Sequence, residues 1–436
     1  MGYTYRHGFL WLFIYFVLAL IPLLLAISGE LPIVREFWIE LGVAFGFIGL
    51  GMMGMQFLFT GRFQKIAPTY NGDNMMQFHK QIGIISILFV LAHPITLILT
   101  DASFLAYFDP HVNFMRALAL SFVLVCLVGI IGSSLWRKAL KLNYEKWRLL
   151  HGLLALAIVF IGVVHALQVS HYMEPLWKKL ALSATMGACM YLVIHTRIVR
   201  PLKNKRHPYK IVRVTPELSD CYTLELEAMT GKKMHYLPGQ YCWITINTTP
   251  FSLQQHPFSL CSSARQPNIQ LTAKALGDFT DTWKTLPLGT TAFLEGPFGV
   301  FIPEPGAHLF LIMGGIGITP AMSMLRTMRD DNDPRQATLI YANQDWENIT
   351  FREELEALTK EINLNLVHVL EEADDDWKGE KGLVTEELLK RHFPRQKEKY
   401  MYFICGPGPL MDTAEVSLRN LGIEWRLVYS ERFEMV

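Results

Sequence analysis

HKQIGIISILFVLAH (His79–His93) and HGLLALAIVFIGVVH (His151–His165) are two apolar stretches of equal length, each with a histidine at both ends. Over fourteen residues an α-helix turns about 1400°, within about 40° of full turns, so the two histidines of each stretch face the same way. They also lie roughly 21 Å apart along the helix axis. If two such helices lie side by side, the spacing predicts two sites for planar groups at different depths. Each group would be held by one imidazole from each helix.

Facing imidazoles on apolar helices indicate haem. Haem iron commonly takes histidine ligands, and ionisable side chains inside a membrane segment are costly and tend to be functional. A single histidine in an apolar helix is more often an ordinary core residue, but two pairs with identical spacing favour ligation. The sequence therefore predicts a membrane cytochrome with two b-type haems, whose iron ligands are His79, His93, His151 and His165.

The first 200 residues contain apolar stretches that are each close to the roughly 20 residues a membrane span requires. We expect residues 1–200 to form a six-helix, all-α transmembrane haem domain. The first stretch has a second interpretation as a signal peptide, because Ala26-Ile27-Ser28 resembles a cleavage site, but its apolar run is longer than is usual for one. The predicted spans are Phe9–Ile27, Leu41–Phe59, Ile82–Thr100, Leu118–Leu135, Leu149–Gln168 and Leu180–His195.

The basic residues predict the orientation. Arg6 lies near the N-terminus, and lysine and arginine gather in the second and fourth loops and after the last span, whereas the other three loops carry only Arg35, Arg116, Lys178 and Lys179. Positive charge concentrates in cytoplasmic loops. We therefore expect an integral protein of a plasma or bacterial inner membrane with both termini in the cytoplasm. The inner haem then lies between His79 and His151, and the outer haem between His93 and His165.

After about residue 206 the composition becomes that of a soluble protein, and this segment is longer than one domain usually is. We expect two domains there, at residues 201–304 and 305–436. The six cysteines show neither paired spacing nor a C-x-x-C motif, so neither disulfides nor zinc are expected. A net charge of +1 without a basic, aromatic-rich patch gives no indication of nucleic-acid binding.

Residues 201–304 are predicted to form an antiparallel β-barrel. Short β-type runs punctuated by proline and glycine recur there, which is typical of small barrels. These runs are Tyr209–Val214, Cys221–Glu227, Gln240–Ile246, Phe258–Cys261, Asn268–Lys274 and Thr291–Glu295.

From residue 305 onward strands and helices alternate, which predicts an α/β doubly wound, parallel sheet that binds a nucleotide. A buried strand at His308–Met313 leads into a turn that contains Gly314, Gly315 and Gly317. We expect Thr319 to be the N-cap and Pro320 the first position of the next helix. An amide-rich turn at a helix N-terminus suits a dinucleotide pyrophosphate. A second buried strand, Tyr400–Ile404, ends at Cys405, Gly406 and Pro407.

The barrel segment carries four motifs in order, Pro238-Gly239-Gln240-Tyr241, His256-Pro257-Phe258-Ser259, Gly277-Asp278-Phe279-Thr280 and Gly296-Pro297-Phe298-Gly299. They resemble the ferredoxin-reductase type of FAD-binding domain. The resemblance implies that Phe258 lies flat against the isoalloxazine, that Ser259 offers its hydroxyl to the reactive edge, and that His256 approaches the FAD pyrophosphate. The backbone amides from Gly277 to Thr280 are expected to cradle that pyrophosphate. Soluble members usually have arginine in place of His256, whereas histidine is typical of the membrane-bound branch.

In the resembled family the Cys405-Gly406-Pro407 turn lies beside the nicotinamide. The ending Ser430-Glu431-Arg432-Phe433 resembles that of reductases in which an aromatic ring shields the flavin until nicotinamide displaces it. Phe433 is the candidate for this role, and an ordinary core aromatic is the alternative. Members that prefer NADPH often place an arginine after the strand that corresponds to Thr338–Tyr341. This chain has Ala342-Asn343-Gln344-Asp345 there, which favours NADH, with Arg352 as an alternative partner for the 2′-phosphate.

Over nearly its full length the chain resembles the ferric reductase and NADPH oxidase superfamily, in which a six-helix bis-haem domain is fused to FAD and NAD(P)H modules. The resemblance implies an enzyme that moves electrons from cytoplasmic NAD(P)H through FAD and two haems to an extracytoplasmic acceptor, for which ferric iron is expected. Three alternatives stay open: a superoxide-generating oxidase, a component that feeds a quinone or an extracytoplasmic partner protein, and a transporter or sensor whose histidines bind a transition metal.

Two observations bear on these alternatives. Superoxide-producing animal oxidases have a second histidine one turn beyond the outer haem ligand, near an arginine of the second helix, whereas this chain has Leu97 at that position and no arginine within Leu41–Phe59. Metal transport does not explain the attached flavin and nicotinamide modules. We expect His111, His171 and His195 to be dispensable for haem, and the outward loops with His111 and His171 to help capture an acceptor.

Overall fold

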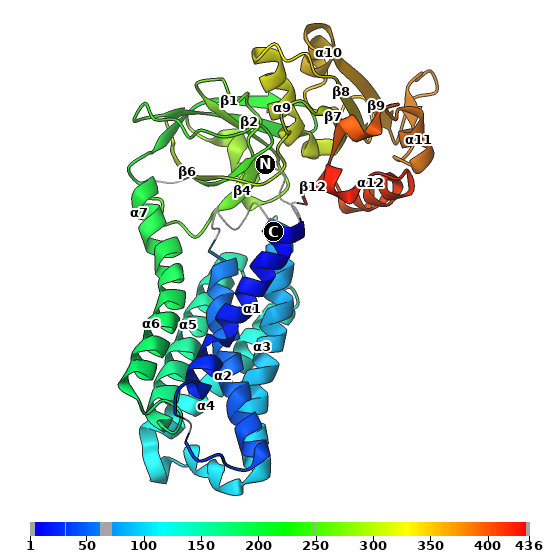
Figure 1. Ribbon diagram of the computed structural model, residues 1–436. Coiled ribbons are helices and arrows are strands. Elements are labelled where there is room, and N and C mark those ends of the chain that lie inside the picture. Colours follow the sequence, from blue (N-terminus) through cyan, green and yellow to red (C-terminus); the bar gives the residue numbers. More distant parts are fainter. Residues whose placement is uncertain (1–4, 31, 62–71, 247–248, 433–436) are drawn as a thin grey trace. The chain divides into compact units, whose positions relative to one another are not determined.

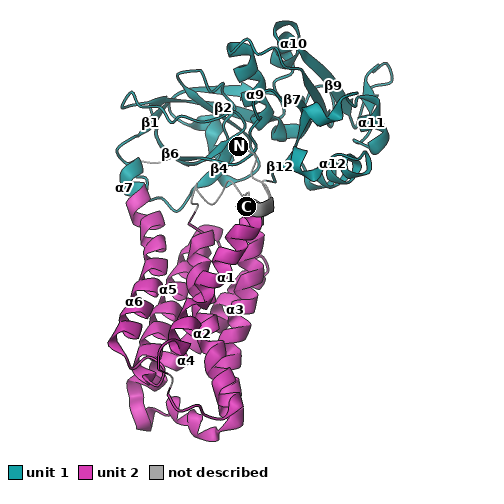
Figure 2. Cartoon of the chain, viewed as in Figure 1, with its two compact units in different colours: residues 1–4, 64–73, 201–436 teal, residues 5–63, 74–200 magenta. Residues whose placement is uncertain are grey.

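The computed structural model describes residues 5–30, 32–61, 72–246 and 249–432 (Figure 1). These residues form two compact units, which Figure 2 colours separately. The helical unit lies within residues 5–200, and the sheet unit comprises Pro201 to Arg432 together with residues 72–73. Each unit is described by itself below.

Long helices make up the helical unit. Each of them is long and apolar enough to cross a membrane, in agreement with the six predicted spans. A short 3-10 helix, η1 (Ala102–Tyr107), precedes α4, and a π-helical turn, η2 (His195–Val199), and α7 (Arg200–Asn204) follow α6. The long helices are α1 (Tyr5–Ile27), α2 (Phe37–Phe59), α3 (Gly72–Thr100), α4 (Pro110–Leu135), α5 (Tyr144–Val169) and α6 (Leu176–Ile194).

Several helices begin before the apolar stretches that predicted them. Helix α4 begins at Pro110 rather than Leu118, and α5 begins at Tyr144 rather than Leu149. The reason is that hydropathy marks the part of a helix that suits lipid, whereas the helix itself begins at its cap. The Asn143 side chain accepts a hydrogen bond from the Lys146 amide at 3.1 Å, which is the usual way to satisfy a free N–H of the first turn.

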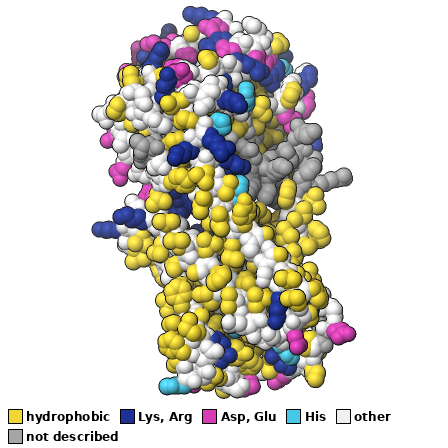
Figure 3. All heavy atoms as spheres, turned by 90° about the vertical axis from the view of Figure 1, so that its left-hand side faces the viewer, with side chains coloured by type: hydrophobic (Ala, Val, Ile, Leu, Met, Phe, Trp, Pro, Cys, Tyr) yellow, Lys and Arg dark blue, Asp and Glu magenta, His cyan; other side chains and the backbone are white. Residues whose placement is uncertain are grey.

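Helix α2 is the centre of the helical unit. Of its apolar window 61% is buried, against 17–22% for the other spans. Glycines let neighbouring helices approach its backbone, as small residues do in membrane bundles. A Cβ atom at Gly51, for example, would stand 1.9 Å from the Ala19 carbonyl oxygen of α1. The outer surface of the unit exposes apolar side chains such as Leu88, Val125 and Phe160, and Figure 3 shows hydrophobic side chains gathered over it.

The first part of the sheet unit is an antiparallel sheet in the order β4-β3-β6-β1-β2-β5. Its two edges meet, because Leu260 bridges Leu271 and the Cys261 amide donates to the Gln270 carbonyl at 2.9 Å. The predicted antiparallel barrel is therefore confirmed. The short helices α8 (Asp278–Asp281) and η3 (Thr282–Thr285) precede its last strand. The strands are β1 (Tyr209–Glu217), β2 (Cys221–Ala228), β3 (Tyr241–Ile246), β4 (His256–Ser259), β5 (Ile269–Lys274) and β6 (Thr291–Phe298).

The second part of the sheet unit is a parallel sheet in the order β10-β9-β8-β7-β11-β12, as predicted. The chain starts at β7, continues to one side through β8 and β9, and then returns to the other side of β7 at β11. The strands are β7 (His308–Gly314), β8 (Ala337–Asn343), β9 (Leu364–Leu370), β10 (Glu380–Lys381), β11 (Tyr400–Cys405) and β12 (Val428–Ser430). The helices are η4 (Gly315–Ile318), α9 (Thr319–Asp330), α10 (Arg352–Glu361), α11 (Glu386–Arg391), η5 (Lys397–Lys399), α12 (Gly408–Asn420) and η6 (Trp425–Leu427).

A buried arginine on α9 joins the two sheets. The Arg326 guanidinium pairs with both carboxylate oxygens of Glu354 at 2.6–2.7 Å and donates to the Cys261 carbonyl at 2.8 Å. Burial by itself would lower the pKa of Arg326, but the Glu354 carboxylate raises it, so the guanidinium stays charged. The ion pair joins α9 to α10, and the hydrogen bond to Cys261 holds α9, which follows the glycine turn, against the barrel.

The start of α9 differs from the prediction. Thr319 is the first helical residue rather than the N-cap, and Ile318 occupies the cap position without a side-chain hydrogen bond. The 3-10 turn η4 runs directly into the helix, so the Thr319 hydroxyl donates backwards to the Ile316 carbonyl at 3.2 Å. Pro320 still lies in the first turn, where its missing N–H costs nothing.

Candidate haem, flavin and nucleotide sites

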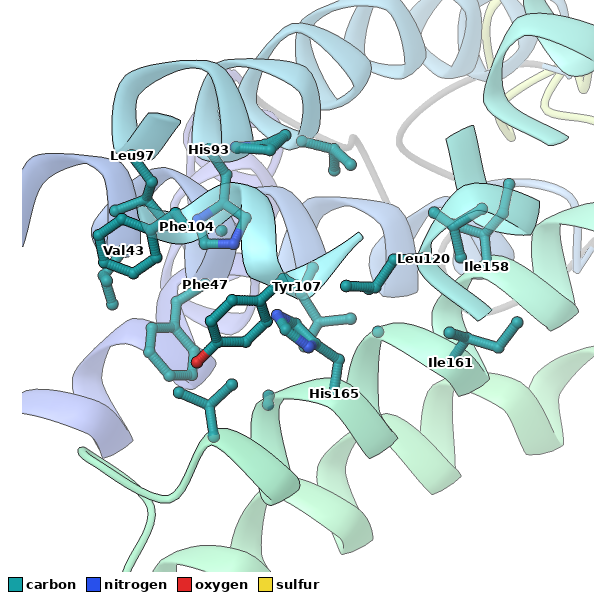
Figure 4. Close-up of a pocket in the computed structure, with 18 of the residues that line it drawn as sticks. Val43, Phe47, His93, Leu97, Phe104, Tyr107, Leu120, Ile158, Ile161 and His165 are labelled. Carbon is teal, nitrogen blue, oxygen red and sulfur yellow. The ribbon is translucent and has the colours of Figure 1, made fainter. Parts of the chain in front are cut away.

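The structure brings the four histidines together in two matching pairs. His79 and His93 lie on α3, and His151 and His165 lie on α5. The ring centres of His79 and His151 are 6.3 Å apart with an interplanar angle of 65°. The ring centres of His93 and His165 have the same separation and the same angle. Figure 4 shows His93 and His165 pointing toward one another.

Hydrogen bonds define which ring nitrogen is free on two of these histidines. His93 Nδ1 lies 2.8 Å from the Gly42 carbonyl oxygen, which can only accept, so Nδ1 carries the proton and Nε2 has a free lone pair. The Ser134 hydroxyl donates to the Ile130 carbonyl, so its oxygen accepts from His151 Nδ1 at the longer distance of 3.4 Å. Both rings therefore hold their Nε2 atoms ready for a metal.

Apolar side chains surround the outer pair. Val43 and Phe47 of α2, Leu97 of α3 and Ile158 of α5 line the cavity into which His93 and His165 project (Figure 4). The ring centre of Tyr107 lies 6.0 Å from that of His165 in an edge-on arrangement. The Arg116 guanidinium in turn stands 4.2 Å from the Tyr107 ring centre. A mostly apolar cavity with two opposed imidazoles suits a flat, largely apolar group.

The histidine pairs fit haem better than a bare metal ion. An imidazole–metal bond is about 2.0–2.1 Å in zinc sites, so rings 6.3 Å apart leave room for one metal ion between them. In the described part of the chain no group of three or more His, Cys, Asp or Glu could hold a metal. A structural zinc site needs four protein ligands, whereas haem iron needs protein only at its axial positions.

Sequence reasoning missed a polar group at the cavity. Arg35, His171 and Tyr172 line the same cavity as His93 and His165. The Arg35 side chain and the Tyr172 hydroxyl both bind the Glu40 carboxylate, and the His171 and Tyr172 rings meet edge-on at 4.8 Å. Arg35 lies outside the predicted span Leu41–Phe59 and precedes α2, whose first turn contains Glu40. The signal that could have found it is the pair of opposite charges beside the predicted span.

The flavin motif on β4 lies within a group of aromatic rings. The His256 ring stacks on Phe279 at 4.2 Å, and Phe258 lies 4.9 Å from Trp283, whose side chain is fully buried. The Ser259 hydroxyl is buried and has no hydrogen-bond partner among the described residues. A buried polar atom without a partner is costly, so it indicates a missing partner. This orphan hydroxyl fits a flavin edge.

The first flavin motif is held by contacts within the protein. Gly239 has a φ of +94°, and a Cβ there would stand 1.9 Å from the Phe301 carbonyl oxygen. The Gln240 side chain accepts from the Leu237 amide and donates to the Gly299 carbonyl, at 2.9 and 3.3 Å. Tyr241 packs on Phe298 with ring centres 5.8 Å apart. These residues therefore connect two of the four motifs.

The motif from Gly277 to Thr280 lies at the start of α8. Gly277 has open space where a Cβ would be. The Thr280 hydroxyl donates to the Gly277 carbonyl at 3.3 Å and accepts from the Leu276 amide at 3.2 Å. The hydroxyl is thus used inside the turn, and the backbone amides of the first turn are the groups left to bind a phosphate.

The two nucleotide turns pack backbone against backbone. A Cβ at Gly317 would lie 2.5 Å from the Cys405 carbonyl oxygen, and a Cβ at Gly314 would lie 2.8 Å from Pro407. These turns follow β7 and β11, the neighbouring strands between which the strand order reverses. Ligands of doubly wound sheets bind at this switch point.

Other parts of the nucleotide site support the glycine turn. The buried Tyr341 hydroxyl lies 3.1 Å from the Gly315 carbonyl, and burial raises the pKa of this phenol, so it stays a neutral donor. Cys405 is 2% exposed, and Arg432 binds Asp412 of α12 at 2.5 Å. Phe433, the candidate shield of the flavin, lies outside the described residues.

Three family models match the chain in succession. They are described as "Ferric reductase like transmembrane component" over residues 45–162, "FAD-binding domain" over residues 212–301 and "Oxidoreductase NAD-binding domain" over residues 311–415. The chain has the fusion architecture of the ferric reductase and NADPH oxidase superfamily. It is an integral membrane protein. The transmembrane match includes His79, His93 and His151 and ends before His165.

Curated relatives match part of the chain. The chain is 33% identical to NADH-cytochrome b5 reductase 2 of Mus musculus over an alignment of 159 residues that covers 32% of this chain and 58% of that protein. It is also 33% identical to the ferredoxin reductase component of 3-ketosteroid-9-alpha-monooxygenase of Rhodococcus rhodochrous over 208 residues, with 46% and 57% covered. The chain thus spans less than two thirds of the length of either relative.

A solved structure supports the fold. The flavohemoglobin of Malassezia yamatoensis with bound FAD and heme has a TM-score of 0.50, covers 92% of this chain and is itself covered to 99%. At 16% identity this likeness concerns the fold alone.

Proposed function

We propose that the chain is an NAD(P)H-dependent transmembrane flavocytochrome that reduces ferric iron on the extracytoplasmic side of a plasma or bacterial inner membrane. A bound FAD accepts two electrons together from NAD(P)H and releases them singly, and two haems b carry one electron each. The proposed axial ligands are His79 with His151 at the inner site and His93 with His165 at the outer site. The excess of basic residues on one side supports a cytoplasmic position for both termini and the sheet unit.

The observation that carries this proposal is that the two histidine pairs have the same geometry. Separations of 6.3 Å and angles of 65° recur at two levels of the same two helices. Ordinary core histidines have no reason to repeat one geometry at a spacing of fourteen residues. Two haem sites at different depths along the helices would let single electrons cross the apolar part of the unit in two shorter transfers.

The residues proposed for the flavin and the nucleotide belong to the sheet unit. His256, Pro257, Phe258, Ser259 and the turn from Gly277 to Thr280 are proposed to hold FAD, with Gly239, Gln240 and Tyr241 supporting them. Gly314, Gly315, Gly317, Thr319, Pro320, Gly406 and Pro407 are proposed to hold NAD(P)H. Ser259, Cys405 and Phe433 are the residues proposed to lie at the point of hydride transfer.

We further propose that NADH is the preferred donor. The Asp345 carboxylate is held by the backbone and side-chain amides of Asn348 at 2.7–2.9 Å, and its charge opposes a 2′-phosphate. Arg352 donates to the Trp346 carbonyl at 2.8 Å and lies over the Trp346 ring, so it is engaged within its own loop. The value of kcat/KM for NADH should exceed that for NADPH by at least tenfold, about 1.4 kcal/mol. Equal values would contradict this preference.

A superoxide-generating oxidase is the second candidate, and one observation favours it. Arg35 and His171 line the outer cavity, so this cavity contains polar side chains that could organise oxygen, although Leu97 occupies the position that carries a histidine in the animal oxidases. Glu40 binds Arg35 and partly neutralises it, which makes Arg35 a weaker partner for a reduced oxygen species. We therefore keep ferric iron as the proposed acceptor.

The test uses vesicles that contain the full chain, with NADH outside and an impermeant ferric chelate enclosed together with a ferrous indicator. Only molecules with the sheet unit outward react with NADH. We expect enclosed iron to be reduced faster than superoxide forms, because an exposed outer haem can pass an electron directly to a chelate. A dismutase-sensitive probe in a parallel preparation measures superoxide.

Superoxide itself reduces ferric chelates, so two controls are needed. The iron signal should persist when dismutase is enclosed and also when oxygen is removed. Loss of the signal under both conditions would show that superoxide carries the electrons, and the oxidase would then be the function.

A further inference from the structure

Gly46 on α2 lies directly against the imidazole of His93. A Cβ atom at Gly46 would stand 2.9 Å from Nδ1 of His93 and 3.1 Å from its Cε1 and Cγ atoms. One turn earlier on α2, the Gly42 carbonyl oxygen is 2.8 Å from the same Nδ1 atom. The absence of a side chain at Gly46 is therefore what lets the ring reach the backbone of α2.

At the inner site no hydrogen bond among the described residues joins a ligand histidine to α2, and His151 Nδ1 has only the longer contact of 3.4 Å with the Ser134 hydroxyl of α4. His79 Nδ1 is buried and has no hydrogen-bond partner within the described residues. Fourteen positions beyond Gly42 and Gly46 the chain has Gln56 and Thr60, and Thr60 is the C-cap of α2. The ring separation and angle are the same in both pairs, so the sites differ in the α3 ligand: His93 is hydrogen-bonded to the backbone of α2 and His79 is not.

We propose that Gly46 is a positioning residue of the outer haem, because it opens the Gly42 carbonyl to a hydrogen bond from His93 and so distinguishes the outer site from the inner one. The inference rests on the proposed haem sites. Such a bond fixes the tautomer and the orientation of a ligating histidine and makes its ring a stronger electron donor. Hydrogen bonding around the axial ligand is one of the ways in which a protein tunes haem iron.

The direction of the effect follows from charge. An imidazole that donates its Nδ1 proton to a carbonyl carries more negative charge on its ring, which favours ferric over ferrous iron. The hydrogen bond therefore lowers the reduction potential of the outer site, from which electrons leave the protein. A more reducing exit site widens the range of acceptors that can be reduced.

The test compares Gly46→Ala with Gly54→Ala in the full chain. A Cβ at Gly54, on the same helix, would lie 3.1 Å from the sulfur of Met186, so this control adds a similar crowding away from the histidines. Gly46→Ala should raise the potential of one haem, so that its ferrous-to-ferric ratio at a fixed applied potential increases severalfold. The affinity of that site for haem should fall by about 10–100-fold. Gly54→Ala should change neither property.

Potentiometric titration of the visible spectrum gives both potentials, and comparison with His165→Ala identifies the outer haem. Unchanged potentials in Gly46→Ala, or equal changes in both variants, would overturn the inference while leaving two haems in place. If the protein without any substitution were found to contain no haem, the proposed function would be overturned, and the inference with it. If Gly46→Ala does not accumulate, electron–nuclear double resonance on the unchanged protein decides. A hydrogen-bonded Nδ1 proton on His93 and a free one on His79 support the inference, and identical environments for these two protons overturn it.

Discussion

Alanine at His93 or His165 is expected to lower the haem content from two per chain to one. The iron loses one of its two protein ligands, and most of the side chains around this pair are apolar. Electron transfer across the membrane should fall by more than the roughly 10–100-fold that the loss of a ligand's hydrogen-bond partner costs. His79→Ala and His151→Ala should have the same effects at the inner site. A pyridine haemochrome assay measures the haem, and the vesicle assay measures the transfer.

Double variants test the pairing itself. His93→Ala with His165→Ala removes both ligands of one site, so one haem should remain. His79→Ala with His93→Ala removes one ligand from each site, so neither haem should be retained. The two double variants change the same number of histidines, and their haem contents differ only if the ligands pair across α3 and α5.

The matched control for these variants is His111→Ala. His111 lies exposed in the first turn of α4, so His111→Ala should leave two haems per chain. His171 is a less suitable control than the sequence implied, because it lines the outer cavity. Two haems per chain in all four single variants would rule out the ligand assignment.

The sequence was sufficient for features that depend on local periodicity. A spacing of fourteen residues fixes the face and the depth of each histidine on its own helix, so the pairs follow once two helices lie face to face. Apolar length gave the six spans in the same way. The contact between Gly46 and His93 could not be predicted, because it depends on which face of α2 packs against α3. That choice is made by tertiary packing.

In the sheet unit, too, local features could be predicted from the sequence and contacts between distant residues could not. Strands and glycine turns carry local signals, and the barrel and the parallel sheet were predicted from them. The start of α9 was misplaced by one residue because η4 continues into the helix, and a 3-10 turn leaves no distinct cap signal at Thr319. The contact between Gly317 and Cys405 joins residues far apart in the chain, so no local pattern reveals it. The role of Phe433 stays a prediction.

Gly317→Ala is expected to slow the reduction of the flavin by NADH by about 100-fold, or roughly 2.7 kcal/mol. The added Cβ would stand 2.5 Å from the Cys405 carbonyl oxygen and 2.8 Å from the Gly406 amide nitrogen. Both neighbours are backbone atoms, which cannot move aside like a flexible side chain. The methyl group therefore forces the two nucleotide turns apart, and overpacking of this kind typically costs about 1–3 kcal/mol of stability as well.

Stopped-flow absorbance with NADH measures this rate, and the FAD content of the purified full chain shows whether the flavin is still bound. Gly306→Ala is the control, because Gly306 lies outside the four flavin motifs and both nucleotide turns and has no atom within 4 Å of its missing Cβ. Its φ of +84° costs the variant roughly 1–2 kcal/mol of backbone strain, but the two turns stay together. Chemical reduction of the haems by dithionite should be normal in both variants, because it does not use the nucleotide site. A normal rate with NADH in Gly317→Ala would mean that the close approach of the two turns is not needed to place the nicotinamide.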